Sequence, residues 1–161
     1  MSFGEDVNIG YSTARGRDWP SVRQFNVVLE NRVGVLLDLV RKFELAENRI
    51  VALSVDDSVD YAIIRMVLSD PERARETFEL AGIAFLESDL LVVQLPEGPQ
   101  PLATICKALL SAEINIHYAY PLMLGAKGHP ALALHVDSHE TAVAILQSQG
   151  FTILAEKDLE G

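Results

Sequence analysis

A short loop after the apolar run Phe25–Leu29 holds the residues best suited to binding a carboxylate. Apolar side chains recur at helical spacing from Val35 onward, which predicts a helix start with free N–H groups and the positive end of the helix dipole. Arg32 can add a charge-assisted hydrogen bond, and Gly34 allows a ligand to approach the backbone closely. Asn31 can both donate and accept hydrogen bonds. The alternative interpretation is that Asn31 caps the helix and that Arg32 is solvated.

Two histidines and one cysteine are the other residues whose types suggest chemistry. His117 and His135 stand about equally far from the middle of a predicted hairpin, which makes them expected cross-strand neighbours on one face. A zinc site needs three or four ligands, and the sequence places no further ligand beside this pair. Cys106 lies among apolar residues of a predicted helix without a nearby base, which predicts a buried thiol. We therefore expect no metal, no cofactor and no catalytic residue.

Four strand residues are expected to serve contacts rather than catalysis. Arg65 lies in the middle of a predicted strand, where an unpaired charge is costly, so it is expected to reach an edge, a partner subunit or an acidic side chain. Tyr118 and Tyr120 share one strand face and are expected to fill an interface. His117 is expected to act as a pH-sensitive hydrogen-bonding group at the domain interface.

The elements that position these residues form two copies of one pattern. Strand, helix, strand, strand, helix and strand follow one another twice between residues 24 and 157. Asp70 and Pro71 mark one helix start, as N-cap and first helical residue. The segment Ala46–Ile50 corresponds to Ala112–Ile116 about 66 residues further on, which indicates a duplicated unit. The expected strands are 25–29, 50–55, 61–68, 83–86, 91–95, 116–120, 131–136 and 151–154.

Each βαββαβ copy, of roughly 65 residues, predicts a four-stranded antiparallel sheet with both helices on one face. The sequence thus predicts an α+β protein of two ferredoxin-like units, residues 23–88 and 89–161, after a flexible arm of residues 1–22. The strands that contain Ile63–Leu68 and Leu90–Val93 are apolar on both faces. Because the face away from the helices must then be covered too, we expect a homodimer or a sheet packed on another sheet.

Length and composition exclude several classes of protein. The 161 residues suffice for one average domain or two small ones. A formal charge of −10 argues against nucleic acid as a partner. One cysteine excludes an intramolecular disulfide, and no apolar run is long enough to cross a bilayer. We expect a cytoplasmic protein without a membrane partner.

The duplicated pattern resembles a stand-alone tandem ACT-domain protein over residues 24–157. The resemblance rests on Glu30–Leu36, Asn48–Ser54 and Asp70–Ala74 in the first copy, and on Ala112–Ile116 and Asp137–Ala142 in the second. It implies a regulatory sensor that binds an amino acid where two ACT domains meet. In such pairs the sheets often join side by side, and the ligand sits between the first loop of one domain and the second strand of its neighbour.

Carried onto this chain, the resemblance implies one better and one poorer ligand site. The better site combines the first loop with the second strand of the other copy: Asn31, Arg32, Val33, Gly34, Val35, Leu36, Asn115, Ile116 and His117. The mirror site pairs the loop Pro96–Pro101 with Asn48, Arg49 and Ile50. It is expected to be poorer because its three prolines lack amide donors and Gln100 replaces the glycine of the first loop.

Two other functions stay open at this point. A ligand-free protein interaction module has the same fold and binds no amino acid. Acylphosphatases also use one βαββαβ unit, with an arginine in a glycine-bearing loop that cradles phosphate, and Arg32–Val35 is distantly similar to that loop. The duplication and the missing glycine-rich pattern argue against this hydrolase, so we expect a protein that is not an enzyme.

Overall fold

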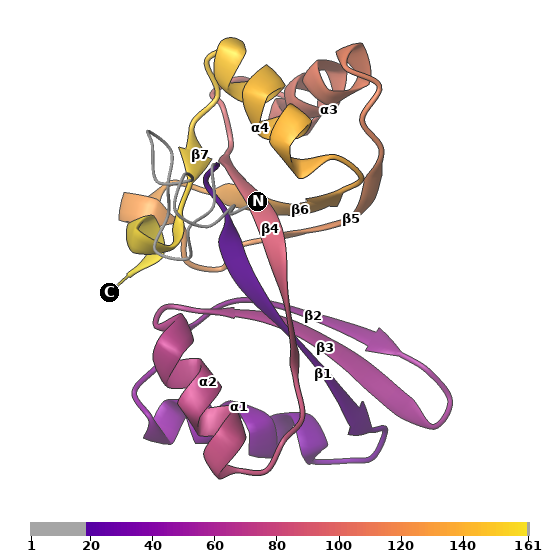
Figure 1. Ribbon diagram of the computed structural model, residues 1–161, viewed down its shortest axis with the longest axis vertical. Coiled ribbons are helices and arrows are strands. Elements are labelled where there is room, and N and C mark those ends of the chain that lie inside the picture. Colours follow the sequence, from indigo (N-terminus) through magenta and orange to yellow (C-terminus); the bar gives the residue numbers. More distant parts are fainter. Residues whose placement is uncertain (1–18, 161) are drawn as a thin grey trace, which may run out of the picture.

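The computed structural model describes residues 19–160, so most of the expected N-terminal arm, residues 1–18, lies outside the described range (Figure 1). Within that range the chain forms seven strands, four α-helices and two short 3₁₀ turns. The strands are β1 (Val22–Glu30), β2 (Ile50–Asp57), β3 (Tyr61–Leu68), β4 (Leu86–Gln94), β5 (Ile116–Pro121), β6 (Ala131–Val136) and β7 (Ile153–Leu154). The helices are α1 (Val35–Leu45), α2 (Pro71–Leu80), α3 (Pro101–Ser111) and α4 (His139–Ser148), and the turns are η2 (Ala126–Gly128) and η3 (Glu156–Leu159).

The strands form two four-stranded antiparallel units that share one strand. The first unit has the order β2-β3-β1-β4, and in the second β4 pairs with both β6 and β7 while β5 pairs with β6. Both orders are those of a ferredoxin-like βαββαβ unit. The predicted fold class is therefore confirmed.

Strand β4 replaces two strands that were expected to be separate, 83–86 and 91–95. Its first half pairs with β1, where Ser88 lies opposite Gln24, and its second half pairs with β6 and β7. The polar stretch Glu87–Asp89 in its middle contains no glycine or proline, so nothing in the sequence interrupts the backbone ladder there. The expected boundary between the units, near Ser88, lies inside this strand.

The two units are joined through β4 and are also folded face to face. Figure 1 shows α1 and α2 outside one sheet, α3 and α4 outside the other, and the two sheets facing each other between them. The buried side chains between the sheets include Val67, Leu90, Val92 and Tyr120. One chain therefore covers the second apolar face of each sheet itself, which confirms the alternative of a sheet packed on another sheet. The edge-to-edge joining that the resemblance implies is present as well, through β4.

Each unit has its own core between its helices and its sheet. Phe25, Phe43 and Phe78 are fully buried in the first unit, with ring centroids 5.2 Å apart for Phe43 and Phe78. Ile105 and Leu146 are fully buried in the second. These aromatic and aliphatic contacts fix the helices on the sheets.

The backbone repeats between the units as the sequence does. Glu47 after α1 and Glu113 after α3 both adopt the left-handed conformation, with φ of 54° and 56°. Gly82 after α2 and Gly150 after α4 do the same, with φ of 69° and 87°. Equivalent helices thus end in the same way, as left-handed C-terminal caps allow. The predicted N-cap Asp70 accepts a hydrogen bond from the backbone N–H of Arg73 at 3.1 Å.

Candidate functional site

The β1–α1 loop, which the sequence marks as the anion site, is largely engaged with its own chain. The side-chain amide of Asn31 donates to a carboxylate oxygen of Asp57 at 2.5 Å and to the carbonyl of Ser58 at 2.9 Å. Arg32 pairs with Glu30 at 3.1 Å. Gly34, with φ of 87°, is the N-cap of α1 and offers no side chain. Asn31 therefore ties the loop to the β2–β3 hairpin and does not cap the helix.

The second part of the predicted site lies in the other unit. Asn115 precedes β5 and its N–H donates to the carboxylate of Asp137 at 3.2 Å. Ile116 is half-buried and His117 is exposed. Figure 1 places the β1–α1 loop at the lower end of the first unit and β5 in the second unit. One chain does not bring the two parts into a single site.

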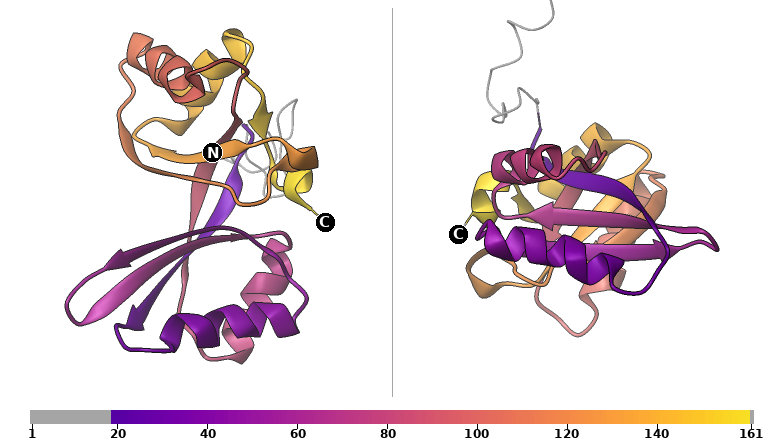
Figure 2. Two further views of the ribbon diagram at one scale, coloured as in Figure 1. Left: turned by 180° about the vertical axis from the view of Figure 1, so that it is seen from behind. Right: turned by 90° about the horizontal axis from the view of Figure 1, so that it is seen from below.

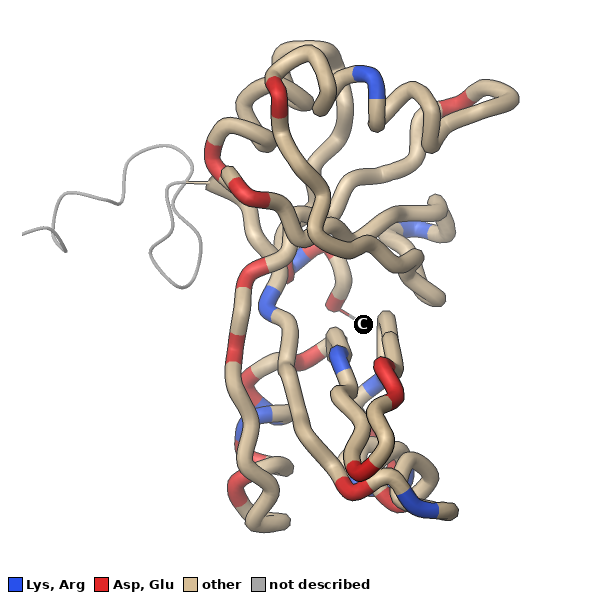
Figure 3. Tube along the Cα trace, turned by 90° about the vertical axis from the view of Figure 1, so that its right-hand side faces the viewer, with Lys and Arg blue, Asp and Glu red and all other residues tan. Residues whose placement is uncertain are grey.

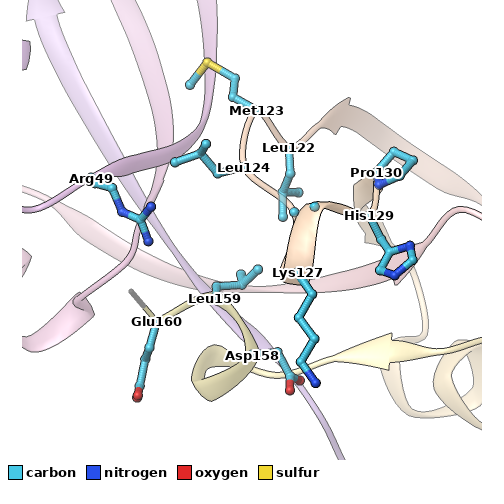
Figure 4. A pocket seen from close by; sticks show the side chains of 12 residues that line it. Arg49, Leu122, Met123, Leu124, Lys127, His129, Pro130, Asp158, Leu159 and Glu160 are labelled. Atoms are coloured by element: carbon cyan, nitrogen blue, oxygen red, sulfur yellow. The ribbon is translucent and has the colours of Figure 1, made fainter.

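A cavity of about 570 Å³ lies where the two units meet (Figure 4). Its walls come from Arg49 immediately before β2, from the β5–β6 loop and from the C-terminal turn η3. Figure 2 shows the β5–β6 loop and this turn side by side at the junction. The volume lies within the range of small-molecule pockets, about 300–1,000 Å³.

Backbone contacts hold the β5–β6 loop against the first unit. The N–H of Met123 donates to the carbonyl of Val51 at 2.7 Å. That carbonyl lies at a register shift in the β2–β3 ladder, between Ile50 and Ala52. A bulge leaves a backbone group without a partner in its own sheet, and here the N–H of Met123 bonds to that group, the carbonyl of Val51.

Two residues of the β5–β6 loop depend on its tight backbone. A Cβ added to Gly125 would lie 1.7 Å from the carbonyl oxygen of His129, so this position requires glycine. Lys127 adopts a left-handed conformation with φ of 52°. The fold of the loop thereby places Lys127 and His129 on the pocket wall.

The turn η3 is anchored on the other wall. Glu156 accepts the backbone N–H of Arg23 at 2.9 Å and pairs with its guanidinium at 3.3 Å. Arg23 is 3% exposed and also contacts Glu72 at 2.6 Å, so it links the C-terminal turn to β1 and α2. Asp158 accepts the N–H of Ala155 at 2.7 Å.

The pocket carries both signs of charge. Arg49 and Lys127 are cationic, whereas Asp158 and Glu160 are anionic. Within the described range, Arg49, Lys127 and Glu160 form no ion pair with protein groups. Figure 4 shows Lys127 and Asp158 extending toward the same side of the pocket, with Arg49 and Glu160 on another. A chain whose acidic residues are spread over both units (Figure 3) thus places two cations at this junction.

The backbone of Arg49 is fixed although its side chain is exposed. Its N–H donates to the hydroxyl of Ser69 at 3.1 Å, and its carbonyl accepts the N–H of the same serine at 2.9 Å. Because the Arg49 guanidinium has no ion-pair partner among residues 19–160, it can offer two parallel N–H donors to a carboxylate. The family resemblance implied a place for Arg49 in the poorer mirror site. The proline-rich partner loop of that site does not line this pocket.

A second polar group, around Gln24, is buried between the sheets and serves the packing of the units. The side-chain amide of Gln24 donates to the hydroxyl of Tyr118 at 2.8 Å and accepts from that of Tyr120 at 2.5 Å. Burial raises the pKa of Tyr120, which keeps this hydroxyl protonated. The expectation that both tyrosines fill an interface is confirmed. Gln24, which is fully buried, was not predicted.

The tyrosine contacts continue to Arg65 and the histidine pair. Arg65 pairs with Asp56 and lies 4.2 Å from the ring centroid of Tyr118. The ring of His135 stacks on Tyr118 at 4.9 Å, and the rings of His117 and His135 are 5.3 Å apart. The expected neighbours His117 and His135 are thus in ring contact, although the strand register pairs His135 with Tyr118. The acidic partner expected for Arg65 is confirmed. In residues 19–160, no group of three or more potential ligands is placed to hold a metal ion.

Cys106 corrects one prediction. The thiol was expected to be buried, but it is exposed. Ile105, Ala108 and Leu109 form the buried face of α3, and Cys106 falls on its outer side. Apolar neighbours in the sequence do not determine which face of a helix a residue occupies.

The fold occurs in several solved structures. Protein BT0572 from Bacteroides thetaiotaomicron has a TM-score of 0.77 and 22% identity, over 86% of this chain and 95% of that one. The ligand-free regulatory subunit of aspartate kinase from Thermus thermophilus has a TM-score of 0.55 and 12% identity, over 80% and 91%. A structure of aspartokinase alpha and beta subunits gives 0.51 and 15%, over 78% and 90%. These similarities show a common fold.

The comparison with curated proteins found no match to the chain. Among the described residues no helix is long and apolar enough to span a membrane.

The family described as the ACT domain pair matches residues 20–161, which include both βαββαβ units and the pocket between them. The chain therefore belongs to the ACT domain pair family.

Proposed function

We propose that this protein is a non-catalytic regulatory sensor that binds an amino acid in the pocket between its two ACT units. The observation that carries the proposal is the mixed charge of that pocket. Arg49 suits the carboxylate of an amino acid, and Asp158 and Glu160 suit its ammonium group. Hydrogen bonds between charged groups contribute about 1.5–3 kcal/mol each, so both ends of a small zwitterion can be held.

Binding at this place couples the two units. Arg49 belongs to the first unit, whereas Lys127 lies on a loop of the second and Glu160 follows η3. A ligand that contacts all of these stabilises one arrangement of the units over others, because it binds only where the groups converge. This is how a protein without catalytic residues reports an amino acid to a partner. Family membership, and the printed description of the Thermus thermophilus relative as a regulatory subunit, support a regulatory role.

The β1–α1 loop is the second candidate location for the same function. The predicted set of Asn31–Leu36 and Asn115–His117 needs a second copy of the chain to be complete, because its parts lie in different units. A homodimer that joins the two parts across its interface is the arrangement this candidate requires. The loop is less favourable because Asn31 and Arg32 already have partners in their own chain.

The experiment is a thermal-shift screen of the twenty amino acids, followed by titration calorimetry of the wild type, Arg49→Ala and Arg32→Ala. A ligand at about a hundredfold its Kd stabilises the protein by roughly 2.7 kcal/mol, which gives a clear shift. We expect at least one amino acid to bind, Arg49→Ala to lose tenfold or more in affinity, and Arg32→Ala to bind as the wild type does.

Three results contradict the proposal, and each identifies the alternative. If no amino acid shifts the unfolding temperature, the protein is a ligand-free interaction module. If Arg32→Ala loses binding and Arg49→Ala keeps it, the ligand occupies the β1–α1 loop. If the protein hydrolyses an acyl phosphate and Arg32→Ala abolishes the turnover, it is a hydrolase.

A further inference from the structure

A second cavity, of about 490 Å³, adjoins the first at the C-terminal end of α1 and the start of β2. Arg49 and Leu124 line both cavities, so the two are neighbours with these side chains between them. The first cavity carries the charged groups, and the second extends from Arg49 toward the first unit's own helix. A ligand held at Arg49 therefore lies at the border of both cavities.

The walls of the second cavity are mainly apolar. Val40, Phe43, Ile50 and Leu124 line it, and Phe43 is fully buried beneath it. Such a surface binds aliphatic groups by removing them from water, and it offers them no polar partner to satisfy.

The one buried polar side chain in that wall, Asn48, is already engaged at both ends. Its amide nitrogen donates to the carbonyl of Asp70 at 2.8 Å. Its oxygen accepts from the hydroxyl of Ser69 at 3.1 Å and from the N–H of Asp70 at 2.9 Å. Since these bonds hold α2 to the start of β2, Asn48 is committed to the fold and does not select a polar ligand group.

The charges around the second cavity disfavour charged ligand side chains. Glu44 and Glu47 lie on its exposed rim and repel a carboxylate. Arg49 lies at its junction with the first cavity and repels a cation. Exposed ion pairs contribute little, so the two rim carboxylates add only a small attraction for an ammonium group.

We propose that the ligand of this sensor is an amino acid with an apolar side chain, bound with its charged groups in the first cavity and its side chain in the second. The inference rests on the proposed function, since it places the carboxylate at Arg49. The two adjoining cavities, one of mixed charge and one apolar, match the two ends of such a molecule.

The test is a calorimetric titration of the wild-type protein with norleucine, lysine, glutamate and alanine. Norleucine and lysine share an unbranched aliphatic stem and differ at its end, which separates apolar contact from charge. Each buried methylene contributes about fourfold in affinity. We expect norleucine to bind at least tenfold more tightly than alanine and than glutamate, and more tightly than lysine.

A variant pair locates the effect. Leu124→Ala shortens a wall residue that lines both cavities, and it is expected to weaken norleucine binding severalfold more than alanine binding. Leu110→Ala removes an equally large, exposed side chain from α3 and serves as the control. Circular dichroism of each variant confirms that it is folded.

The outcomes separate this inference from the proposed function. If lysine, glutamate or alanine binds more tightly than norleucine and Arg49→Ala loses that binding, the ligand does not have an apolar side chain. The proposed function as an amino acid sensor is then still supported. Equal effects of Leu124→Ala on norleucine and alanine also overturn it. Absence of binding by every amino acid overturns both.

Discussion

The β1–α1 loop and the pocket between the units each carry an exposed arginine, and within residues 19–160 the loop's arginine has an ion-pair partner whereas the pocket's arginine has none. Arg32 in the loop pairs with Glu30, and its neighbour Asn31 is bonded to Asp57 and Ser58. Arg49 in the pocket has no ion-pair partner among the described residues, although its backbone is fixed. A residue of a suitable type does not by itself make a binding site, because its hydrogen-bond donors can already be bonded to other residues of the same chain.

The largest expected difference comes from removing Arg23, which anchors the turn η3 beside the pocket, and Arg32, which lies in the β1–α1 loop. Arg23→Met takes a buried cation away from Glu72 and Glu156 beside the pocket and is expected to destabilise the protein by about 3 kcal/mol. Arg32→Met breaks an exposed pair in the loop and is expected to cost less than about 1 kcal/mol. Urea unfolding measures both free energies.

The Arg23 variant also sharpens the link between fold and site. Because Arg23 anchors η3, Arg23→Met is expected to weaken the amino acid ligand in the folded protein as well. Unchanged affinity in a folded Arg23→Met protein would show that the pocket does not depend on this anchor.

A pair of glycine substitutions separates the two regions next. Gly125→Ala places a methyl group against the backbone of His129 and must shift the β5–β6 loop, at a cost of about 2–3 kcal/mol and with loss of ligand binding. Gly34→Ala meets nothing within 4 Å but forces a left-handed alanine, at about 1–2 kcal/mol, with binding retained. Thermal unfolding and calorimetry of both variants check this, and equal loss of binding in the two would contradict the assigned location.

A smaller effect is expected from the β1–α1 loop itself. Asn31→Ala removes the hydrogen bonds to Asp57 and Ser58 at an exposed position, so stability is expected to fall by about 1 kcal/mol. Ligand affinity is expected to stay at the wild-type value. A large loss of affinity would move the site to this loop.

The smallest effect is a pH dependence at the edge of the interface between the sheets. Burial lowers the pKa of His135, and the positive charge of His117 and Arg65 lowers it further. The unfolded chain therefore binds a proton at His135 more readily than the folded chain does. The stabilisation that comes from neutral His135 is present above about pH 6.5, and it is lost as the pH falls through the lower pKa of the folded state. Unfolding free energies at pH 7.5 and 5 are expected to differ less in His135→Gln than in the wild type, and the same difference in both proteins would argue against a role for His135.

The elements and their duplication could be predicted because their signals are local. Asp70 followed by Pro71 starts α2, and the repeated segments Ala46–Ile50 and Ala112–Ile116 fold alike, down to the left-handed Glu47 and Glu113. The apolar faces of the strands also predicted that the open side of each sheet is covered. Local pattern did not show that one strand, β4, serves both units, since Glu87–Asp89 is polar but can continue a strand.

The pocket could not be predicted because its walls come from three distant segments. Arg49, Lys127 and Glu160 meet only because the two sheets fold against each other and the β5–β6 loop docks on the carbonyl of Val51. A sequence shows the residue types at each place, whereas their convergence depends on the packing angle of the units. The buried Gln24 was missed for the same reason, since its tyrosine partners lie more than ninety positions away in the chain.

The most direct test of the pocket as an amino acid site is a crystal structure of the full chain grown with the amino acid that gives the largest thermal shift. The proposal predicts density for the ligand between the units, with its carboxylate within hydrogen-bond distance of Arg49. Density beside Gly34 and Arg32 at the start of α1, with the pocket between the units holding only water, would contradict it.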